Sequence, residues 1–294
     1  MGKDVALVLS SGGARGFAHI GAINELESRG YNITSVAGTS MGALVGGIYA
    51  SGRLREFEEW VSSLDMMEVL RLTDVTLSSN GFVKGNRIIE KLKEIVHDHD
   101  IEDLPIPYCA IATDLIRGRE RIFNNGSLFN AIRASISIPT FFQPYKLGGD
   151  YFVDGGLVNP IPINRVKRID GDLLAVVNVN ADIPHVMMEP PEEPEEKGIL
   201  RMIRSINDRT GKHIPKNKKD HIGLFNLNNR SISIMLNQIT ALTLRNYQVD
   251  LMVSISRESY GTYDFYRAAE IIREGRRATS VALEGLESGE YTGL

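Results

Sequence analysis

The stretch Gly38-Thr39-Ser40-Met41-Gly42 lies between a short apolar segment, residues 35–37, and a run of small helix-forming residues, 43–50. A strand, a sharp turn and a helix in this order are the setting of a nucleophile elbow, which lifts one serine out of a buried sheet. The turn is crowded, so glycine is needed two residues before and after the serine. The stretch therefore predicts a strand–turn–helix unit with Ser40 as a nucleophile. The alternative is an ordinary tight turn with a solvent-facing serine.

Short apolar strands alternate with amphipathic helices along the chain. The expected strands are 5–9, 35–39, 108–113, 173–178 and 251–255, with a hairpin around 148–150, and the expected helices are 17–29, 54–64, 85–98, 127–135, 231–248 and 263–288. This alternation is typical of an α/β fold with a mostly parallel central sheet and helices on both faces. We expect one domain, 1–294, with its core motifs within 4–180 and with residues 224–294 completing it.

The composition is that of an ordinary globular protein. The chain has 294 residues, 43% of them hydrophobic, and a net charge of −4, which gives no support for nucleic-acid binding. No apolar run approaches the roughly 18 residues that span a bilayer. No signal peptide precedes the first strand, and one cysteine is compatible with a reducing compartment. We therefore expect a cytoplasmic protein, whose oligomeric state the sequence does not predict.

Regular patterns lapse in residues 181–223, where we expect an irregular charged insertion. Residues 189–196 are acidic and rich in proline, and residues 197–219 are strongly basic. Such a composition is typical of a mobile, solvated segment. The alternative is a lid or an element that touches a membrane, because basic amphipathic segments are attracted to anionic lipid. A transient, peripheral contact with a membrane surface is therefore one of the expectations.

The loop Ser10-Ser11-Gly12-Gly13-Ala14-Arg15-Gly16 follows the first expected strand and opens a helix. It lacks the first glycine and the later acidic residue of the dinucleotide fingerprint, and it lacks the Gly-Lys-Ser/Thr of a P-loop. Bare N–H groups at a helix N-terminus stabilise negative charge, so Gly13 and Ala14 are candidate oxyanion donors. The loop should adjoin the elbow, because both turns follow neighbouring strands. Arg15 either reinforces this field or is a surface arginine.

A serine nucleophile requires a base. The six histidines give no convincing candidate: His19 lies in the first expected helix, His97 and His99 lie in a polar stretch, and the others lie in or beside the insertion. Asp154 has a better setting, because it follows a hairpin strand and precedes two glycines that let backbone approach closely. A carboxylate in a dry site can accept the hydroxyl proton directly. Asp154 is therefore the preferred base.

Together these segments resemble the patatin-like phospholipases. The resemblance covers about residues 4–180 and rests on Gly12-Gly13-Ala14-Arg15-Gly16, Gly38-Thr39-Ser40-Met41-Gly42 and Asp154-Gly155-Gly156 in this order, with support from residues 133–144 and 159–162. It implies a three-layer sandwich related to the α/β-hydrolases and a Ser40–Asp154 dyad without metal or cofactor. It also implies an oxyanion hole at Gly12, Gly13 and Ala14, supported by the motif residues Arg15, Gly16, Gly38, Gly42, Gly155 and Gly156. One departure is Ser10-Ser11, where many members carry aspartate and a third glycine.

The resemblance implies hydrolysis of ester bonds in phospholipids or related acyl lipids, so the expected partner is an acyl lipid. Phe141, Phe142, Leu157 and Val158 either line an acyl channel or pack in the core. Three alternatives remain open: a Ser-His-Asp esterase, a transacylase that passes the acyl group to an alcohol, and a catalytically idle binding module on the same fold. Residues from 181 onward match no pattern, so head group and chain length are not predicted.

Overall fold

The computed structural model of the protein describes residues 3–72, 86–139, 141–184 and 224–289. Its strands are β1 (Lys3–Leu9), β2 (Tyr31–Thr39), β3 (Tyr108–Asp114), β4 (Arg119–Phe123), β5 (Tyr145–Leu147), β6 (Asp150–Asp154), β7 (Leu173–Ala181) and β8 (Leu251–Ser256). Its α-helices are α1 (Ala18–Ser28), α2 (Met41–Ala50), α3 (Leu54–Ser63), α4 (Met66–Leu72), α5 (Asn86–Ile95), α6 (Leu128–Ser135), α8 (Leu224–Leu244) and α9 (Ala268–Ser288). Short 3-10 helices are η1 (Gly13–Phe17), η2 (Ile101–Asp103), η3 (Gly155–Leu157), η4 (Ile163–Arg165) and η5 (Phe265–Arg267). Each expected strand and helix is present, whereas the insertion expected at 181–223 lies outside the described residues from 185 onward.

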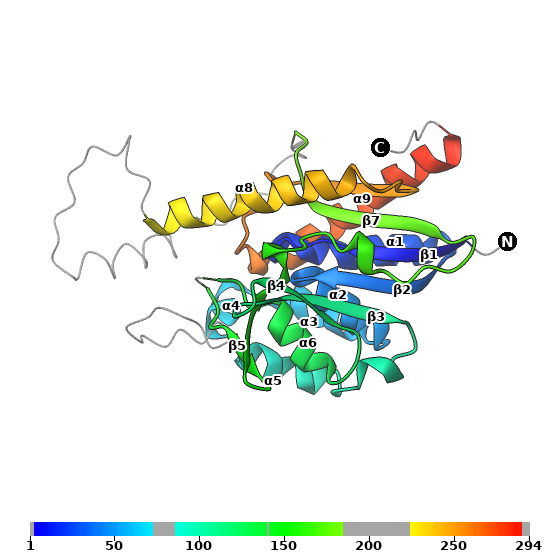
Figure 1. The fold of residues 1–294 in the computed structure, drawn as a ribbon. Helices are drawn as coiled ribbons and strands as arrows, with labels where there is room; N and C mark the ends of the chain where they lie inside the picture. Colours follow the sequence, from blue (N-terminus) through cyan, green and yellow to red (C-terminus); the bar gives the residue numbers. More distant parts are fainter. Residues whose placement is uncertain (1–2, 73–85, 140, 185–223, 290–294) are drawn as a thin grey trace, which may run out of the picture.

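The strands form one mixed sheet in the order β5-β6-β3-β2-β1-β7-β8, and β4 pairs with β3. Every pair among β3, β2, β1, β7 and β8 is parallel. The pairs that involve β4, β5 and β6 are antiparallel. The predicted mostly parallel sheet is therefore confirmed. Its carboxyl edge, where β1 and β2 both end, carries the glycine loop and the Ser40 turn (Figure 1).

The pairing of β3 brings the ends of β2 and β6 together. β2 pairs with the first half of β3, where Thr39 lies opposite Ile111. β4 occupies the other edge of β3 from Ala110 onward, so β6, which pairs with the second half, shares the edge of β2. Asp154 lies there opposite Ala112, directly after Ile111. The carboxyl ends of β2 and β6 therefore meet, which places Ser40 beside Asp154.

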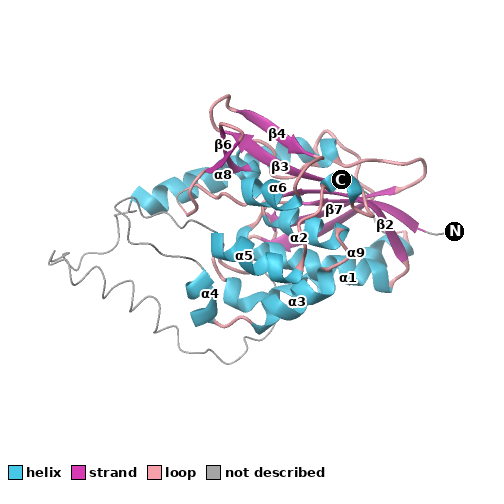
Figure 2. Ribbon diagram, turned by 90° about the horizontal axis from the view of Figure 1, so that it is seen from below, coloured by secondary structure: helices cyan, strands magenta, loops and turns pink. Residues whose placement is uncertain are grey.

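One face of the sheet carries the larger hydrophobic core. Leu7 and Leu9 of β1 pack there with the buried residues Ile20 and Ile23 of α1. The helices α1, α2, α6 and α9 also contribute to this core, and Figure 2 shows α1, α3 and α9 together below the strands. α1 and α9 are in close backbone contact. A β-carbon on Gly275 of α9 would lie only 2.0 Å from the carbonyl oxygen of Ala18, the first residue of α1. The tight packing of these helices fixes the glycine loop that precedes α1.

The opposite face of the sheet carries a smaller core. Val8, Val176 and Met252 pack there against Ile161, which belongs to the irregular segment that precedes β7. Leu244, the last residue of α8, packs against this core as well. α8 runs beside β7 and extends beyond the carboxyl ends of the parallel strands (Figure 1). The sheet thus lies between a layer of helices and a layer formed by α8 and this segment, which is consistent with the predicted three-layer α/β sandwich.

Some elements differ from the expected ranges. α8 begins at Leu224 rather than at residue 231, although the asparagines in its first turns are poor helix formers. Helix growth is cooperative, so the apolar turns that follow extend it across these residues. β4 was not expected, because its residues Arg119, Glu120 and Arg121 are charged and only its pairing with β3 holds it as a strand. Within the described ranges, no helix is both long enough and apolar enough to span a membrane.

Candidate active site

Ser40 lies between β2 and α2 in a strained backbone conformation. Its φ is 57° and its ψ is −123°, and no other non-glycine residue in the described ranges has a positive φ. Such a conformation costs about 1–3 kcal/mol and persists only where the surrounding structure imposes it. A β-carbon on Gly38 would lie 2.3 Å from the carbonyl oxygen of Gly42, and one on Gly42 would lie 2.2 Å from that of Leu9. The turn is therefore as sharp and crowded as the two glycines predict.

The hydroxyl of Ser40 donates a hydrogen bond to Asp154. The distance from Oγ to Oδ2 is 2.5 Å, and the two residues are only 2% and 7% exposed. Burial raises the pKa of Asp154 to about 6, against the opposing effect of hydrogen bonds from Ser40 and from the N–H of Gly156. A carboxylate with this pKa is ionised at neutral pH and is still basic enough to accept a proton from a hydroxyl under reaction. The pair can therefore act as a nucleophile and its base.

The main chain on both sides fixes the carboxylate of Asp154. Its Oδ1 accepts a hydrogen bond from the N–H of Gly156 at 2.7 Å. Its own N–H donates to the carbonyl of Ser137 at 2.9 Å, and its carbonyl accepts from Oγ1 of Thr113 at 2.8 Å. A β-carbon on Gly155 would lie 2.1 Å from a carbonyl oxygen of β3. Glycine after Asp154 is therefore required for β6 to end against β3.

The glycine loop lies against the Ser40 turn, as predicted from their positions after neighbouring strands. A β-carbon on Gly16 would lie 2.3 Å from the side chain of the first residue of α2. Among the described residues, the N–H groups of Gly12 and Gly13 have no hydrogen-bond acceptor. The N–H of Ala14, by contrast, donates to the carbonyl of Thr262 at 2.9 Å. Of the three predicted oxyanion donors, Gly12 and Gly13 are free, and Ala14 is held by a loop that follows β8.

Arg15 holds the glycine loop to the end of β7. Its guanidinium donates to the carbonyl of Val179 at 3.1 Å, to Oδ1 of Asn180 at 2.7 Å and to the carbonyl of Tyr260 at 2.7 Å. Asn180 in turn donates through its side-chain amide to the carbonyl of Ser11. Burial lowers the pKa of Arg15 to about 10, which leaves it cationic at neutral pH. Its hydrogen bonds make Arg15 a structural residue of the loop and not the surface arginine that was one of the two alternatives.

The histidines in the described residues have structural or surface positions, as expected. Nε2 of His19 lies 2.8 Å from the carbonyl oxygen of Ser10, so this nitrogen must carry the proton. Burial lowers the pKa of His19 to about 4, and the ring is therefore neutral. His97 and His99 are exposed. The remaining three histidines, which the sequence places in or beside the insertion, lie outside the described residues.

Ser135, at the end of α6, is a positioning residue that the sequence did not single out. The N–H of Ser40 donates to its Oγ at 2.8 Å, and this Oγ donates to the carbonyl of Ile111 at 2.5 Å. The hydroxyl therefore ties the strained turn to β3. Arg133 of the same helix is buried and donates to Oγ of Ser137 at 2.6 Å. The sequence signal that could have identified Ser135 is the spacing of Arg133, Ser135 and Ser137. These residues were used only as support for the family resemblance.

An apolar pocket adjoins Ser40 on the helical face of the sheet. It is narrow, with a volume of about 80 Å³, and apolar side chains form nearly all of its wall. These side chains are Phe17, Met41, Leu44, Phe57, Trp60, Val61, Leu64, Val69, Leu72, Ile88, Leu92, Ile136, Ile138, Phe141, Phe142 and Phe265. Phe141 and Phe142 thus line the pocket, in agreement with the channel alternative. Leu157 does not line it, and neither does Val158, which faces a different pocket.

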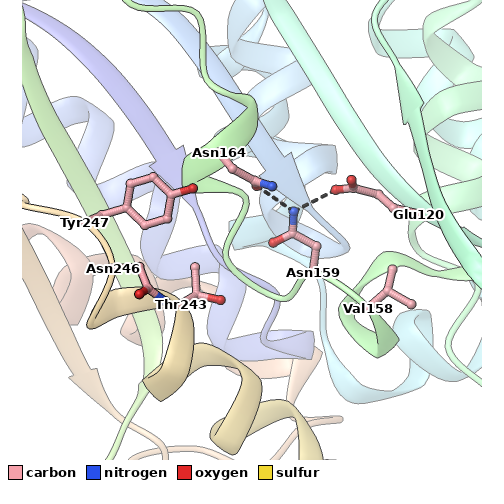
Figure 3. Close-up of a pocket in the computed structure, with 7 residues that line it drawn as sticks. All are labelled: Glu120, Val158, Asn159, Asn164, Thr243, Asn246 and Tyr247. Carbon is pink, nitrogen blue, oxygen red and sulfur yellow. Dashed lines mark hydrogen bonds between the residues drawn. The ribbon is translucent and has the colours of Figure 1, made fainter.

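That second pocket lies on the opposite face of the sheet and is polar. Its volume is about 400 Å³, and its lining residues are Glu120, Val158, Asn159, Asn164, Thr243, Asn246 and Tyr247 (Figure 3). The side-chain amide of Asn159 donates to Glu120 at 2.7 Å and to Asn164 at 2.9 Å. Glu120 is also paired with Arg165. In the ranges that the structure describes, no group of three or more His, Cys, Asp or Glu side chains could hold a metal ion.

Comparison with known proteins identifies relatives along most of the chain. An uncharacterized NTE family protein of Mycobacterium tuberculosis is 34% identical over 96% of this chain and 92% of its own length. Patatin-like phospholipase domain-containing protein 6 of Homo sapiens is 31% identical over 61% of this chain and 14% of its own length. A lysophospholipase of Yarrowia lipolytica is 32% identical over 61% of this chain and 13% of its own length. Among solved structures, VipD from Legionella pneumophila covers 97% of this chain and 67% of its own, with 15% identity and a TM-score of 0.47.

The family model described as patatin-like phospholipase matches residues 7–166, which is more than half of the chain. The matched region includes β1, the glycine loop, the Ser40 turn and Asp154 at the end of β6. Family membership supports a lipid ester hydrolase. On the strength of this match and of the full-length mycobacterial relative, the chain belongs to the patatin-like phospholipase family.

Proposed function

We propose that this protein is a serine acyl hydrolase that cleaves ester bonds of phospholipids or related acyl lipids through a Ser40–Asp154 dyad. The observation that carries the proposal is the 2.5 Å hydrogen bond from Ser40 Oγ to Asp154 Oδ2 beside an apolar pocket. A nucleophile in direct contact with a buried base is the arrangement that covalent acyl transfer requires. The narrow apolar pocket suits the acyl part of the substrate, because each buried methylene contributes about 0.8 kcal/mol.

In the first step Ser40 attacks the ester carbonyl while Asp154 accepts the hydroxyl proton. The carbonyl oxygen becomes negatively charged, and its proposed donors are the N–H groups of Gly12 and Gly13, which have no acceptor among the described residues. Collapse of this intermediate breaks the bond to the alcohol, which takes the proton from Asp154. The product is an acyl-enzyme at Ser40. Water, deprotonated by Asp154, then releases the fatty acid and returns a proton to Ser40.

Two variants test the dyad. Ser40→Ala removes the nucleophile, and Asp154→Asn keeps the size of the side chain but removes the base. We expect each to lower kcat on a soluble nitrophenyl ester by at least about 10³-fold, since members of such a unit act together. Urea unfolding of each variant checks that the fold is retained. Turnover near the wild-type rate in either variant would contradict the dyad.

Three further measurements separate the competing functions. A serine-directed fluorophosphonate should label the wild-type protein at Ser40, whereas an idle module would not be labelled. A Ser-His-Asp esterase predicts that replacing one histidine removes activity, and we expect no such loss. Added glycerol traps the acyl group as a new ester if the protein is a transacylase. We expect free fatty acid as the main product.

We also propose that the protein meets its substrate at a membrane surface. Among the described side chains of α8, the exposed large apolar ones are Leu227, Ile234, Met235 and Leu242, and the sequence of the helix contains no acidic residue. An apolar helix face without negative charge suits contact with anionic lipid. The basic segment 197–219, which the sequence offered for this contact, lies outside the described residues.

Sedimentation with anionic and zwitterionic vesicles tests this contact. Ile234→Glu should weaken vesicle binding, whereas Val281→Glu, an equally exposed position on α9, should not. Equal binding of both variants would remove α8 from the proposal.

A further inference from the structure

Ser11, in the glycine loop, carries a buried hydroxyl that the two-step mechanism does not use. The residue is 5% exposed, and its Oγ has no hydrogen-bond partner in the described part of the chain. A buried hydroxyl without a partner lowers stability by about 1–3 kcal/mol. The Ser11 hydroxyl is therefore a cost to the stability of the fold rather than a contribution to it. Such an orphaned group at an active site calls for a ligand as its partner.

The neighbouring serine shows what a structural hydroxyl looks like in this loop. Oγ of Ser10 donates to the carbonyl of Ser11 at 3.2 Å and accepts from the N–H of Val179 at 3.1 Å. The Ser10 hydroxyl therefore uses both of its hydrogen-bonding functions, one within the loop and one to β7. Ser11 makes no such connection through its side chain, although its main chain is held by the carbonyl of Pro160 at 2.8 Å. The loop does not need the Ser11 hydroxyl for its conformation.

The Ser11 hydroxyl and the carboxylate of Asp154 lie on the same side of Gly156. A β-carbon on Gly156 would lie 3.4 Å from Oγ of Ser11 and 3.0 Å from Oδ1 of Asp154. The third nearest atom is an apolar carbon of Leu236, at 3.5 Å. The two oxygens therefore approach each other with only one apolar side chain beside them. One water or alcohol oxygen that binds between them would satisfy Ser11 and would contact the base at the same time.

We infer that Ser11 and Asp154 together hold the oxygen that leaves in the first step and the water that attacks in the second. This inference rests on the proposed function, because it assigns a place to the second reactant of the same site. The alcohol and the water use one place, since deacylation is the reverse of acylation with water as the alcohol. Ser11 donates a hydrogen bond to this oxygen, and the water donates one to Asp154 Oδ1. The water is thereby oriented with its second lone pair toward the acyl carbon.

The proton balance of the reaction does not change. The water oxygen forms the new bond to the acyl carbon, and one water proton passes to Asp154. The bond from the acyl carbon to Oγ of Ser40 breaks, and Ser40 takes the proton back from Asp154. Ser11 keeps its own proton throughout and acts only by binding the reacting oxygen. The effect of Ser11 on the rate should therefore be largest in deacylation, because the water that reacts in this step is weakly bound.

The experiment compares Ser11→Ala with Ser10→Ala on nitrophenyl butyrate. In Ser11→Ala we expect deacylation to slow by about tenfold, because one hydrogen bond to the water is lost. Acylation by this good leaving group should change little. A burst of nitrophenol and a butyryl adduct on Ser40, seen by intact-protein mass spectrometry, would report the trapped acyl-enzyme. Its melting temperature should stay the same or rise, since an unsatisfied hydroxyl is removed.

Ser10→Ala is the matched control. It removes a hydroxyl with two partners, so we expect a lower melting temperature and no change in the ratio of the two steps. Ser11→Ala with a wild-type deacylation rate would overturn the inference. A lower melting temperature with equal loss in both steps would also overturn it, because that pattern marks a structural residue. A wild-type protein that neither hydrolyses nitrophenyl butyrate nor is labelled at Ser40 by a fluorophosphonate would instead overturn the proposed function itself, and the inference with it.

Discussion

The two pockets on opposite faces of the sheet differ in how their lining groups are satisfied. In the polar pocket the lining side chains bind one another: Asn159 donates to Glu120 and Asn164, and Glu120 pairs with Arg165 (Figure 3). In the apolar pocket nearly the whole wall is apolar, and the hydroxyl of Ser40, which also lines it, is already bound to Asp154. A self-satisfied polar cluster stabilises the fold, whereas an empty apolar wall gains from a ligand.

The end of β2 connects the two pockets. Thr39 turns its hydroxyl toward the polar side, where Oγ1 donates to the carbonyl of Asn159 at 2.8 Å. Ser40, the next residue, faces the apolar side. The polar cluster therefore anchors the end of β2 on one face of the sheet, and Ser40 projects toward the other face. We infer that the larger pocket is structural and that the smaller one binds the acyl chain.

The largest effect on activity is expected from a change in the wall of the apolar pocket at Leu64, the residue just after α3. Leu64→Trp fills part of the narrow pocket, so long acyl chains should no longer fit, while acetyl esters still should. In the wild-type protein kcat/KM should rise with chain length by up to about fourfold per methylene, the equivalent of about 0.8 kcal/mol. The variant should lose this rise, which amounts to as much as about 4 × 10³-fold for an octanoyl ester against an acetyl ester. Kinetics on nitrophenyl acetate, butyrate and octanoate measure it.

Leu64→Met is the control, because it keeps the volume and the apolar character of the side chain. It should retain the chain-length dependence of the wild-type protein. Equal loss on acetate and octanoate in Leu64→Trp would mean a disturbed fold. No loss on either would show that the acyl chain binds elsewhere.

The pH dependence of turnover tests whether the dyad lies in a dry site. Burial on the apolar side raises the pKa of Asp154 to about 6, and the base must be ionised to accept the proton of Ser40. Activity should therefore be constant above this pH and should fall about tenfold per pH unit below it. A pH profile of kcat/KM on a neutral ester measures the midpoint. A midpoint near 4 would place Asp154 in water, and acid unfolding must be excluded by circular dichroism at each pH.

The sequence predicts those parts of the site that local crowding determines. At Gly38, Gly42 and Gly155 a β-carbon would collide with a main-chain oxygen. Only glycine fits there, so the glycines around Ser40 and Asp154 already indicate tight turns. The strands follow from short apolar runs, and the mostly parallel sheet follows from their alternation with helices. The approach of Ser40 to Asp154 then requires only that β2 and β6 share one edge of β3.

Contacts between distant segments could not be predicted in this way. The loop pattern made Ala14 an oxyanion donor, but its N–H is bound by Thr262, which lies beyond the last residue of the family match. The apolar faces of α3 and α5 look alike in sequence whether they fill a core or line a pocket. Val158 was a candidate for the acyl channel because it follows the Asp154 motif, yet the turn at η3 directs it to the polar face.

The smallest effect on turnover is expected from the polar pocket. Asn159→Ala removes two hydrogen bonds, at 2.7 Å to Glu120 and at 2.9 Å to Asn164, and leaves Glu120 with one partner fewer. The free energy of unfolding should fall by about 1–3 kcal/mol. The main-chain carbonyl of residue 159 can still accept the hydrogen bond from Thr39, because the substitution changes only the side chain. We therefore expect kcat/KM on a short ester to change by less than about threefold. Urea unfolding and kinetics below the transition measure the two quantities.

Asn246→Ala provides the matched control, because Asn246 lines the same pocket but is exposed just after α8, and its side chain makes only an exposed hydrogen bond to the carbonyl of Leu242. It should affect neither stability nor turnover. If the Asn159 variant instead lost activity and kept its stability, the polar pocket would bind part of the substrate, and the head group would be the candidate. Stability loss without activity loss supports the assignment made from the contacts: one side of β2 anchors the strand end, and the other carries the chemistry.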